Sequence, residues 1–233
     1  MEFLLDTVHI PDIEKYNAII PLSGVTSNPT ICKKEGHFEF FDHMCQIRHI
    51  LGPDKSLHVQ VVGQTAEAMI ADAHMILKEI DDQVFIKVPT NEAGLTAIKQ
   101  LKHEGVHITA TAIYTEFQGL LAIQAGADYI APYYNRMANM NIDAAAVVQA
   151  FANAINANQA NTKILAASFH NVAQVTTALA CGAQAVTMGV DILKSGLGMP
   201  AIGQAVADFT QDWEENFGAH QTVASLPTET PQI

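Results

Sequence analysis

The feature that most constrains this chain is a regular alternation of short apolar segments, rich in β-branched residues, with longer segments of helical spacing. Such an alternation is typical of βα units that build a parallel sheet. The apolar segments predict strands at 2–7, 22–27, 57–63, 84–88, 107–112, 128–133, 163–168 and 184–188. The other segments predict helices at 11–19, 38–51, 65–80, 92–104, 114–125, 142–157, 171–181 and 189–195, with C-caps at Gly105, Gly126 and Gly182.

Eight such units with no linker between them favour a closed (β/α)8 TIM barrel over an open sheet. The length of 233 residues suits one barrel, since barrels commonly need roughly 200 to 250 residues. We therefore expect an α/β barrel over 1–198 and one further amphipathic helix over 199–218, which packs on its own or a neighbouring barrel. The segment 219–233 is rich in Thr, Pro and Gln and is expected to be a flexible tail.

Charge and hydropathy exclude several classes of partner. The chain has 12 Lys and Arg against 24 Asp and Glu, a net charge of −12, which repels nucleic acid and anionic membranes. No stretch reaches the roughly 18 uninterrupted apolar residues of a membrane span, and no basic region precedes the first apolar residues. We expect a cytoplasmic protein whose three cysteines, an odd number, are reduced thiols.

A lysine is expected inside the barrel. Alternation along 84–88 points Phe85 and Lys87 into the lumen and leaves the other side chains to the helices. Burial disfavours the ammonium form, so a lumen lysine has a lowered pKa and some nucleophilic amine, as Schiff-base chemistry requires. The structural alternative is a lysine that extends to solvent or pairs with the inward carboxylate of Asp6.

Other polar side chains are expected near this lysine, at the carboxyl ends of the strands where barrels carry their chemistry. Alternation places these residues there, with the last just past its strand: Asp6, Thr26, Gln60, Thr111, Tyr133, Ser168 and Asn28. Each alone is explained as a satisfied core polar group, but their convergence on a lysine favours a site. Arg136, whose alternative is a surface ion pair, together with Ser168 after the seventh strand, suits a phosphorylated substrate.

Two apparent metal motifs do not fit metal chemistry. The segment His103-Glu104-Gly105-Val106-His107 matches the zinc-protease pattern, which needs both histidines on one helical face. Gly105 is expected to end the helix, so that His107 opens a strand. Cys32, His37, His43 and Cys45 have no spacing typical of zinc ligands. Neither motif is therefore expected to bind a metal.

Four motifs in chain order resemble the transaldolase family, and most closely its branch of small fructose-6-phosphate aldolases. The resemblance runs from Met1 to about Gly218. The motifs are Gly24-Val25-Thr26-Ser27-Asn28-Pro29, Ile86-Lys87-Val88-Pro89, Ala131-Pro132-Tyr133-Tyr134-Asn135-Arg136 and Leu165-Ala166-Ala167-Ser168-Phe169. The segment 137–141 departs from the family because it lacks a glycine-rich turn.

The resemblance implies a role for each site residue. The family's Schiff-base lysine falls on Lys87, and its acid–base tyrosine falls on Tyr133, which works through a water held by Gln60 and Thr111. Gln60 and Tyr133 stand where true transaldolases have glutamate and phenylalanine, which favours the aldolase branch. The polar groups around a bound dihydroxyacetone unit fall on Asp6, Thr26 and Asn28, and the phosphate contacts fall on Arg136 and Ser168.

The function implied is that of a class I aldolase, without metal or cofactor, that interconverts fructose 6-phosphate with dihydroxyacetone and glyceraldehyde 3-phosphate. The resemblance also implies a ring-type homo-oligomer, a pentamer or decamer, in which the 199–217 helix reaches a neighbour. Three alternatives stay open: a transaldolase that transfers the dihydroxyacetone unit, a metal hydrolase built on His103, Glu104 and His107, and a sugar-phosphate binder without catalysis.

Overall fold

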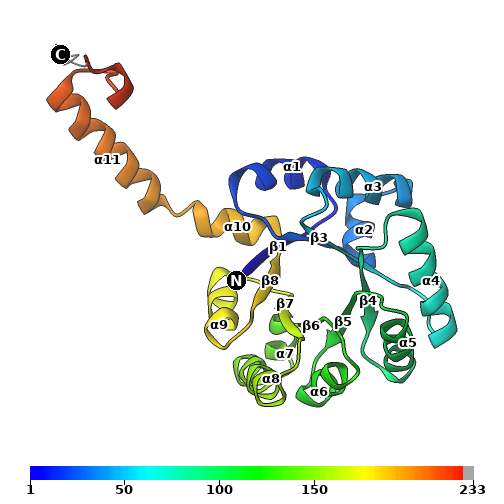
Figure 1. The fold of residues 1–233 in the computed structure, drawn as a ribbon. Helices are drawn as coiled ribbons and strands as arrows, with labels where there is room; N and C mark the ends of the chain where they lie inside the picture. The colour runs from blue at the N-terminus through cyan, green and yellow to red at the C-terminus, as the bar shows by residue number, and fades with distance from the viewer. Residues whose placement is uncertain (228–233) are drawn as a thin grey trace, which may run out of the picture. The chain divides into compact units, whose positions relative to one another are not determined.

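The computed structural model describes residues 1–227 and contains a closed barrel of eight parallel strands in chain order, with helices around it (Figure 1). The strands are β1 (Glu2–Asp6), β2 (Gly24–Thr26), β3 (Ser56–Gln60), β4 (Phe85–Pro89), β5 (Ile108–Ile113), β6 (Tyr129–Pro132), β7 (Lys163–Ala166) and β8 (Ala185–Met188). Strand β8 pairs with β1 and closes the sheet. The predicted α/β barrel is confirmed, and each predicted strand lies within a few residues of an observed one.

Helices follow each strand along the chain. They are α1 (Ile10–Ile19), α2 (Pro29–Glu35), α3 (Phe40–Leu51), α4 (Ala66–Glu79), α5 (Glu92–His103), α6 (Glu116–Gln124), α7 (Tyr134–Asn139), α8 (Ala144–Asn158), α9 (Val172–Ala180), α10 (Val190–Leu197) and α11 (Pro200–Phe217). The sequence pattern did not predict α2 and α7. Both are too short to show a helical period, which needs a window of about 11 residues.

Side-chain caps begin many of these helices at the end of the barrel where the strands terminate. In each case the capping side chain accepts a hydrogen bond from the backbone N–H three residues later, which satisfies a donor that the helix leaves free. The caps are Asn28, Thr65, Asn91, Thr115, Asp143 and Asn171. They fix the loops that follow the strands.

Three glycines end helices at the opposite end of the barrel. Gly105, Gly126 and Gly182 have φ angles of 83°, 85° and 99°, a region that glycine enters without strain. The C-cap residue is in each case the residue before the glycine, so these glycines lie one position later than the C-cap that the sequence predicted. The early end of α5 also separates His103, its last residue, from His107.

The core has two parts, one on each face of the sheet. Between the strands and the helices lies a large apolar cluster that includes Ile86 and Val88. Inside the barrel, Phe85 packs against a smaller cluster of Leu4, Tyr129, Leu165 and Ala185. The alternation expected along β4 is therefore confirmed, and it leaves Lys87 on the lumen side above this apolar floor.

The chain divides into two compact units, Met1–Leu193 and Lys194–Ile233. In the second unit α11 has no buried residue, and its Trp213 and Phe217 rings lie 4.2 Å apart. The expected tail 219–233 contains a 3-10 turn at Val223–Ser225, and its residues 228–233 lie outside the described part. No helix within residues 1–227 is long and apolar enough to cross a membrane.

Candidate active site

A polar cavity of about 600 Å³ opens at the carboxyl ends of the strands. Its walls come from all sides of the barrel, as expected for this end of the fold. They include every residue that the sequence placed in the site: Asp6, Thr26, Asn28, Gln60, Lys87, Thr111, Tyr133, Arg136 and Ser168. Their convergence is thus a property of the structure, whereas their chemical roles stay predictions.

Lys87 lies on β4 and is 4% exposed. Its Nζ donates a hydrogen bond of 2.7 Å to the carbonyl oxygen of Ser27, just past β2. Burial lowers the pKa of Lys87, and the nearby Asp6 and Cys32 oppose that shift. The site therefore holds an oriented amine that deprotonates more readily than a free lysine.

Tyr133 follows β6 and is the residue directly before α7. Its hydroxyl is 3.1 Å from Thr111 Oγ1 on β5. The pairing of β5 with β6 shifts register between Ala110 and Ile113, and Ala112 has a φ of 55°, a strained value for alanine. Burial raises the pKa of Tyr133, while the hydrogen bond with Thr111 lowers it. Because burial is the largest effect, the phenol of Tyr133 stays neutral and can donate a proton.

A chain of hydrogen bonds joins three strands on the other side of the cavity. Thr26 Oγ1 donates to Asp6 Oδ1 at 2.6 Å and lies 2.7 Å from Thr187 Oγ1. Because a hydroxyl has one proton, Thr187 must donate to Thr26. One carboxylate oxygen of Asp6 is thus occupied, which fixes the orientation of the carboxylate toward the cavity.

Asn28 and Gln60 bring amide groups to the same wall. Asn28 caps α2 by accepting a 3.0 Å hydrogen bond from the N–H of Ile31, and the residue also lines the cavity. Gln60 pairs with Lys87 across β3 and β4. Its Oε1 is buried without a hydrogen-bond partner among the described residues. Since buried carbonyl oxygens are almost always partnered, Gln60 suits binding of a water or a substrate group.

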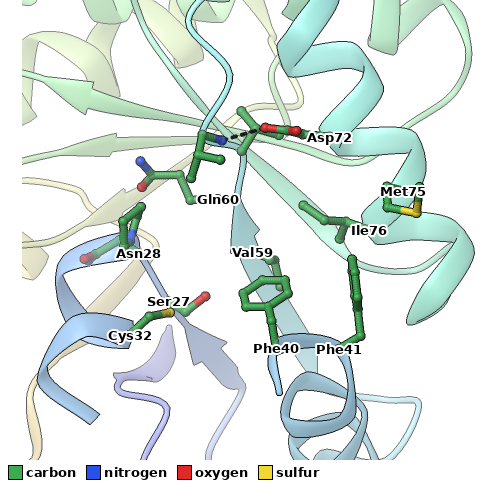
Figure 2. A pocket seen from close by; sticks show the side chains of 13 residues that line it. Ser27, Asn28, Cys32, Phe40, Phe41, Val59, Gln60, Asp72, Met75 and Ile76 are labelled. Atoms are coloured by element: carbon green, nitrogen blue, oxygen red, sulfur yellow. Dashed lines mark hydrogen bonds between the residues drawn. The ribbon is translucent and has the colours of Figure 1, made fainter. Parts of the chain in front are cut away.

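A second, apolar cavity of about 390 Å³ adjoins this wall (Figure 2). Asn28 and Gln60 line both cavities. Figure 2 shows the aromatic rings of Phe40 and Phe41 from α3 on one side, and Asp72 of α4, which accepts a backbone hydrogen bond after β3, on the other. The lining of this cavity is mostly apolar, and Lys87, Thr111 and Tyr133 line the polar cavity instead.

Arg136 brings a cation to the mouth of the polar cavity. Its Nη1 donates to the hydroxyl of Tyr114 at 2.8 Å, and its guanidinium lies 4.8 Å from the centre of the Tyr133 ring. Ser168 follows β7 with a φ of 61°. Arginine and a hydroxyl at this position suit a phosphate group.

Groups that could hold a metal are not found in the described part of the chain. His107 stands just before β5 and stacks on Phe85 at 4.9 Å, whereas His103 ends α5. The two histidines of the zinc-protease pattern therefore do not share a helical face, and the hydrolase alternative has no geometric support.

Comparison with known proteins places the chain in a family. Residues 3–229 match the family Transaldolase/Fructose-6-phosphate aldolase. The chain belongs to this transaldolase/fructose-6-phosphate aldolase family. A probable fructose-6-phosphate aldolase of Streptococcus pneumoniae (strain ATCC 700669 / Spain 23F-1) is 56% identical over 213 residues, which cover 91% of this chain and 96% of that protein.

A solved structure shows the barrel in a more distant protein. The inosine 5'-monophosphate dehydrogenase of Legionella pneumophila superposes with a TM-score of 0.55 at 13% identity. The match covers 82% of this transaldolase/aldolase family member and 58% of the dehydrogenase chain. At that identity the likeness concerns the fold alone.

Among the polar residues that line the site of this family member, Thr187 and Tyr114 are two that were missed from the sequence. Thr187 lies at the end of β8 and bonds to Thr26, and the alternation that selected the other strand ends could have found it. Tyr114 follows β5 after the register shift. No periodicity could have placed its hydroxyl against Arg136.

Proposed function

We propose that this protein is a class I aldolase that cleaves fructose 6-phosphate to dihydroxyacetone and glyceraldehyde 3-phosphate, and catalyses the reverse addition. The observation that carries the proposal is the buried amine of Lys87, which donates a hydrogen bond to the Ser27 carbonyl and lines a polar cavity together with the other polar strand ends. The family and the name of the Streptococcus relative support it.

In this mechanism the neutral amine of Lys87 attacks the ketone carbon of the sugar phosphate and forms a carbinolamine. Loss of water gives an iminium, which accepts the electron pair when the C3–C4 bond breaks. A base removes the proton of the C4 hydroxyl as glyceraldehyde 3-phosphate leaves. The resulting enamine takes a proton at C3, and water then hydrolyses the iminium to free dihydroxyacetone and the lysine amine.

Tyr133 moves these protons through a water that Gln60 and Thr111 position. The 3.1 Å contact of Tyr133 with Thr111 and the buried, unpartnered Oε1 of Gln60 support this assignment. A phenol kept neutral by burial suits the role, because it can donate a proton and recover it from water.

The remaining residues hold the two ends of the substrate. Asp6, Thr26 and Asn28 bind the hydroxyl groups of the dihydroxyacetone unit, a role supported by their place in the cavity lining together with Lys87. Arg136 and Ser168 bind the phosphate at the mouth of the cavity, where the guanidinium supplies the positive charge.

Borohydride trapping tests the Schiff base. The protein is mixed with fructose 6-phosphate or dihydroxyacetone, reduced, and analysed by mass spectrometry for a stable adduct. We expect one adduct, at Lys87, that is lost in Lys87→Met and kept in Lys99→Met, an exposed lysine of α5. Full trapping in Lys87→Met would contradict the assignment.

A time course of glyceraldehyde 3-phosphate release without an added acceptor separates the aldolase from a transaldolase. Sustained linear release with free dihydroxyacetone supports the aldolase. A burst of about one equivalent per site followed by near-arrest indicates a transaldolase that retains its enamine. Tight binding without any release would favour the non-catalytic sugar-phosphate binder.

We also propose a homo-oligomer in which α11 packs on a neighbouring subunit. Its support is a stripe of exposed apolar residues at helical spacing, Ile202, Val206 and Phe209, which are 48%, 59% and 71% exposed. Sedimentation should show a pentamer or decamer that dissociates in Phe209→Asp; a monomeric wild-type protein would contradict the proposal. The cytoplasmic location stays a prediction.

A further inference from the structure

Tyr114 lies between the two groups proposed to act at opposite ends of the substrate, Arg136 at the phosphate and Tyr133 at the reacting carbons. It follows β5 directly, lines the polar cavity and is half-buried. Its hydroxyl accepts the 2.8 Å hydrogen bond from Arg136 Nη1. Its ring meets the ring of Tyr133 edge-on, with the centroids 5.5 Å apart at an interplanar angle of 72°. One side chain therefore touches both the candidate phosphate-binding cation and the candidate acid–base group.

Besides its hydrogen bond to Tyr114, the side chain of Arg136 contacts the ring of Tyr133. It is exposed, and within residues 1–227 it forms no ion pair with a carboxylate. Its guanidinium lies over the face of Tyr133 at 4.8 Å, a favourable distance for a cation above an aromatic ring. The Tyr114 hydroxyl is thus the polar contact that selects this orientation from the many rotamers of a long side chain.

We propose that Tyr114 is a positioning residue that holds the guanidinium of Arg136 over the ring of Tyr133. In that position Arg136 binds the phosphate of the substrate so that the reacting carbon atoms lie within reach of the acid–base group, Tyr133. This inference rests on the function proposed above, because it assumes that Arg136 binds a phosphate. Tyr114 itself forms no bond to the substrate. Its contribution is to order the side chain of Arg136 before the substrate binds. The loss of conformational entropy of that side chain then does not weaken substrate binding.

The electrostatics of the trio support the same arrangement. Arg136 opposes the rise that burial causes in the pKa of Tyr133, and the hydrogen bond from Arg136 to Tyr114 raises the pKa of Arg136. If the guanidinium of Arg136 moved away, it would lose both its contact with the Tyr133 ring and its hydrogen bond to Tyr114. Phosphate binding and proton transfer are therefore coupled through a single side chain whose place Tyr114 sets.

Tyr114→Phe removes the hydroxyl and keeps the ring against Tyr133. A hydrogen bond to a charged group that orders a binding side chain changes affinity by about tenfold. For fructose 6-phosphate we expect KM to rise about tenfold and kcat to change much less. For the addition of dihydroxyacetone to unphosphorylated D-glyceraldehyde we expect a change of less than about twofold, because no phosphate is engaged.

A double-mutant cycle excludes a general structural effect. In an Arg136→Ala background, Tyr114→Phe should add no further loss toward fructose 6-phosphate, because the group it positions is absent. Tyr16→Phe, a buried tyrosine of α1 remote from the cavity, is the matched control and should leave both reactions unchanged. Equal losses for phosphorylated and unphosphorylated acceptors, or additive losses in the cycle, would overturn the inference.

A second readout does not depend on turnover. Titration with inorganic phosphate, followed by ³¹P NMR line broadening, should show weaker binding in Tyr114→Phe than in the wild type, and the same weak binding in Arg136→Ala. Unchanged phosphate binding in Tyr114→Phe would overturn the inference. If the wild-type protein binds phosphate in this way but does not cleave fructose 6-phosphate, the proposed function fails while the role of Tyr114 stands.

Discussion

The Nζ atom of Lys87 lies 2.7 Å from the carbonyl oxygen of Ser27, a residue 60 positions earlier in the chain. Ser27 follows β2 and Lys87 lies on β4, so the contact passes over β3 inside the barrel. A carbonyl accepts a hydrogen bond from a neutral amine as well as from an ammonium. Ser27 therefore orients the lysine in both forms, and burial decides how readily the proton leaves.

The first prediction concerns the pH dependence of Schiff-base formation. Burial lowers the pKa of Lys87, so the neutral amine should be present at a lower pH than in a free lysine, whose pKa is about 10.4. The rate of adduct formation with dihydroxyacetone, trapped by borohydride at a series of pH values, should rise with a midpoint below that value. A midpoint at or above it would contradict the assignment of a desolvated amine.

Asp6 provides a control in the opposite direction. Its carboxylate raises the pKa of Lys87 and so opposes the effect of burial. Asp6→Asn should move the midpoint of adduct formation to a lower pH, even if the variant binds dihydroxyacetone less tightly. The midpoint can be compared at saturating ketone, which separates the charge effect from the loss of affinity.

The second prediction separates proton transfer from covalent chemistry. Tyr133→Phe removes the hydroxyl that contacts Thr111, and loss of a general acid–base group should lower kcat for cleavage by about 10² to 10⁴. The borohydride adduct at Lys87 should still form. Tyr134→Phe, the next residue, whose ring packs on Phe169 instead, should retain activity. A Tyr133→Phe enzyme at wild-type rates would remove Tyr133 from the mechanism.

Alternation accounts for how much of the site could be predicted from the sequence. A strand in a closed barrel sends every second side chain inward, so Gln60, Lys87 and Thr111 could be placed in the lumen once their strands were recognised. The register then brings Gln60 beside Lys87. The eight-strand fold was predictable for the same reason, because each strand is a short apolar run between helices.

Features that depend on local backbone geometry could not be predicted. The register shift in β5 and the positive φ of Ala112 leave no compositional signal, although they set the path of the chain toward Tyr114. Helices α2 and α7 begin directly after strand ends and are too short to show a period. The contact of Tyr114 with Arg136 joins the loop after β5 to the short helix α7, and neither segment carries a repeating pattern long enough to place these side chains.

The third prediction tests the hydrogen-bond chain at β1, β2 and β8. Thr26→Val keeps the shape of the side chain but removes the hydroxyl that links Asp6 to Thr187. Two polar groups then lose a partner, which should lower the free energy of unfolding by about 1 to 3 kcal/mol. Urea denaturation measures the change. Thr26→Ser keeps the hydroxyl and should be less affected, so equal stability of the two variants would contradict the network.

The last prediction concerns the pH dependence of stability and the buried histidine beneath the site. His58 lies in the lumen, where its Nδ1 is 2.8 Å from Thr109 Oγ1, its Nε2 is 2.9 Å from Ser56 Oγ, and its ring stacks on Phe85. Burial lowers the pKa of His58 well below 6.5, and the charge of Lys87 adds to the shift. The folded protein therefore keeps this imidazole neutral.

Unfolding exposes His58 to water and returns its pKa to about 6.5, so below that pH the unfolded chain binds a proton that the folded chain does not. The contribution of His58 to stability is complete above about pH 6.5 and is lost as the pH falls, by up to about 1.4 kcal/mol per pH unit. Urea denaturation between pH 7 and pH 5 should show this slope.

In His58→Phe the overall stability falls, because Ser56 and Thr109 lose a partner, but the slope of stability against pH should decrease. His37→Gln, which removes an exposed histidine, should leave the slope unchanged; a slope that persists in His58→Phe would assign the pH dependence to other groups.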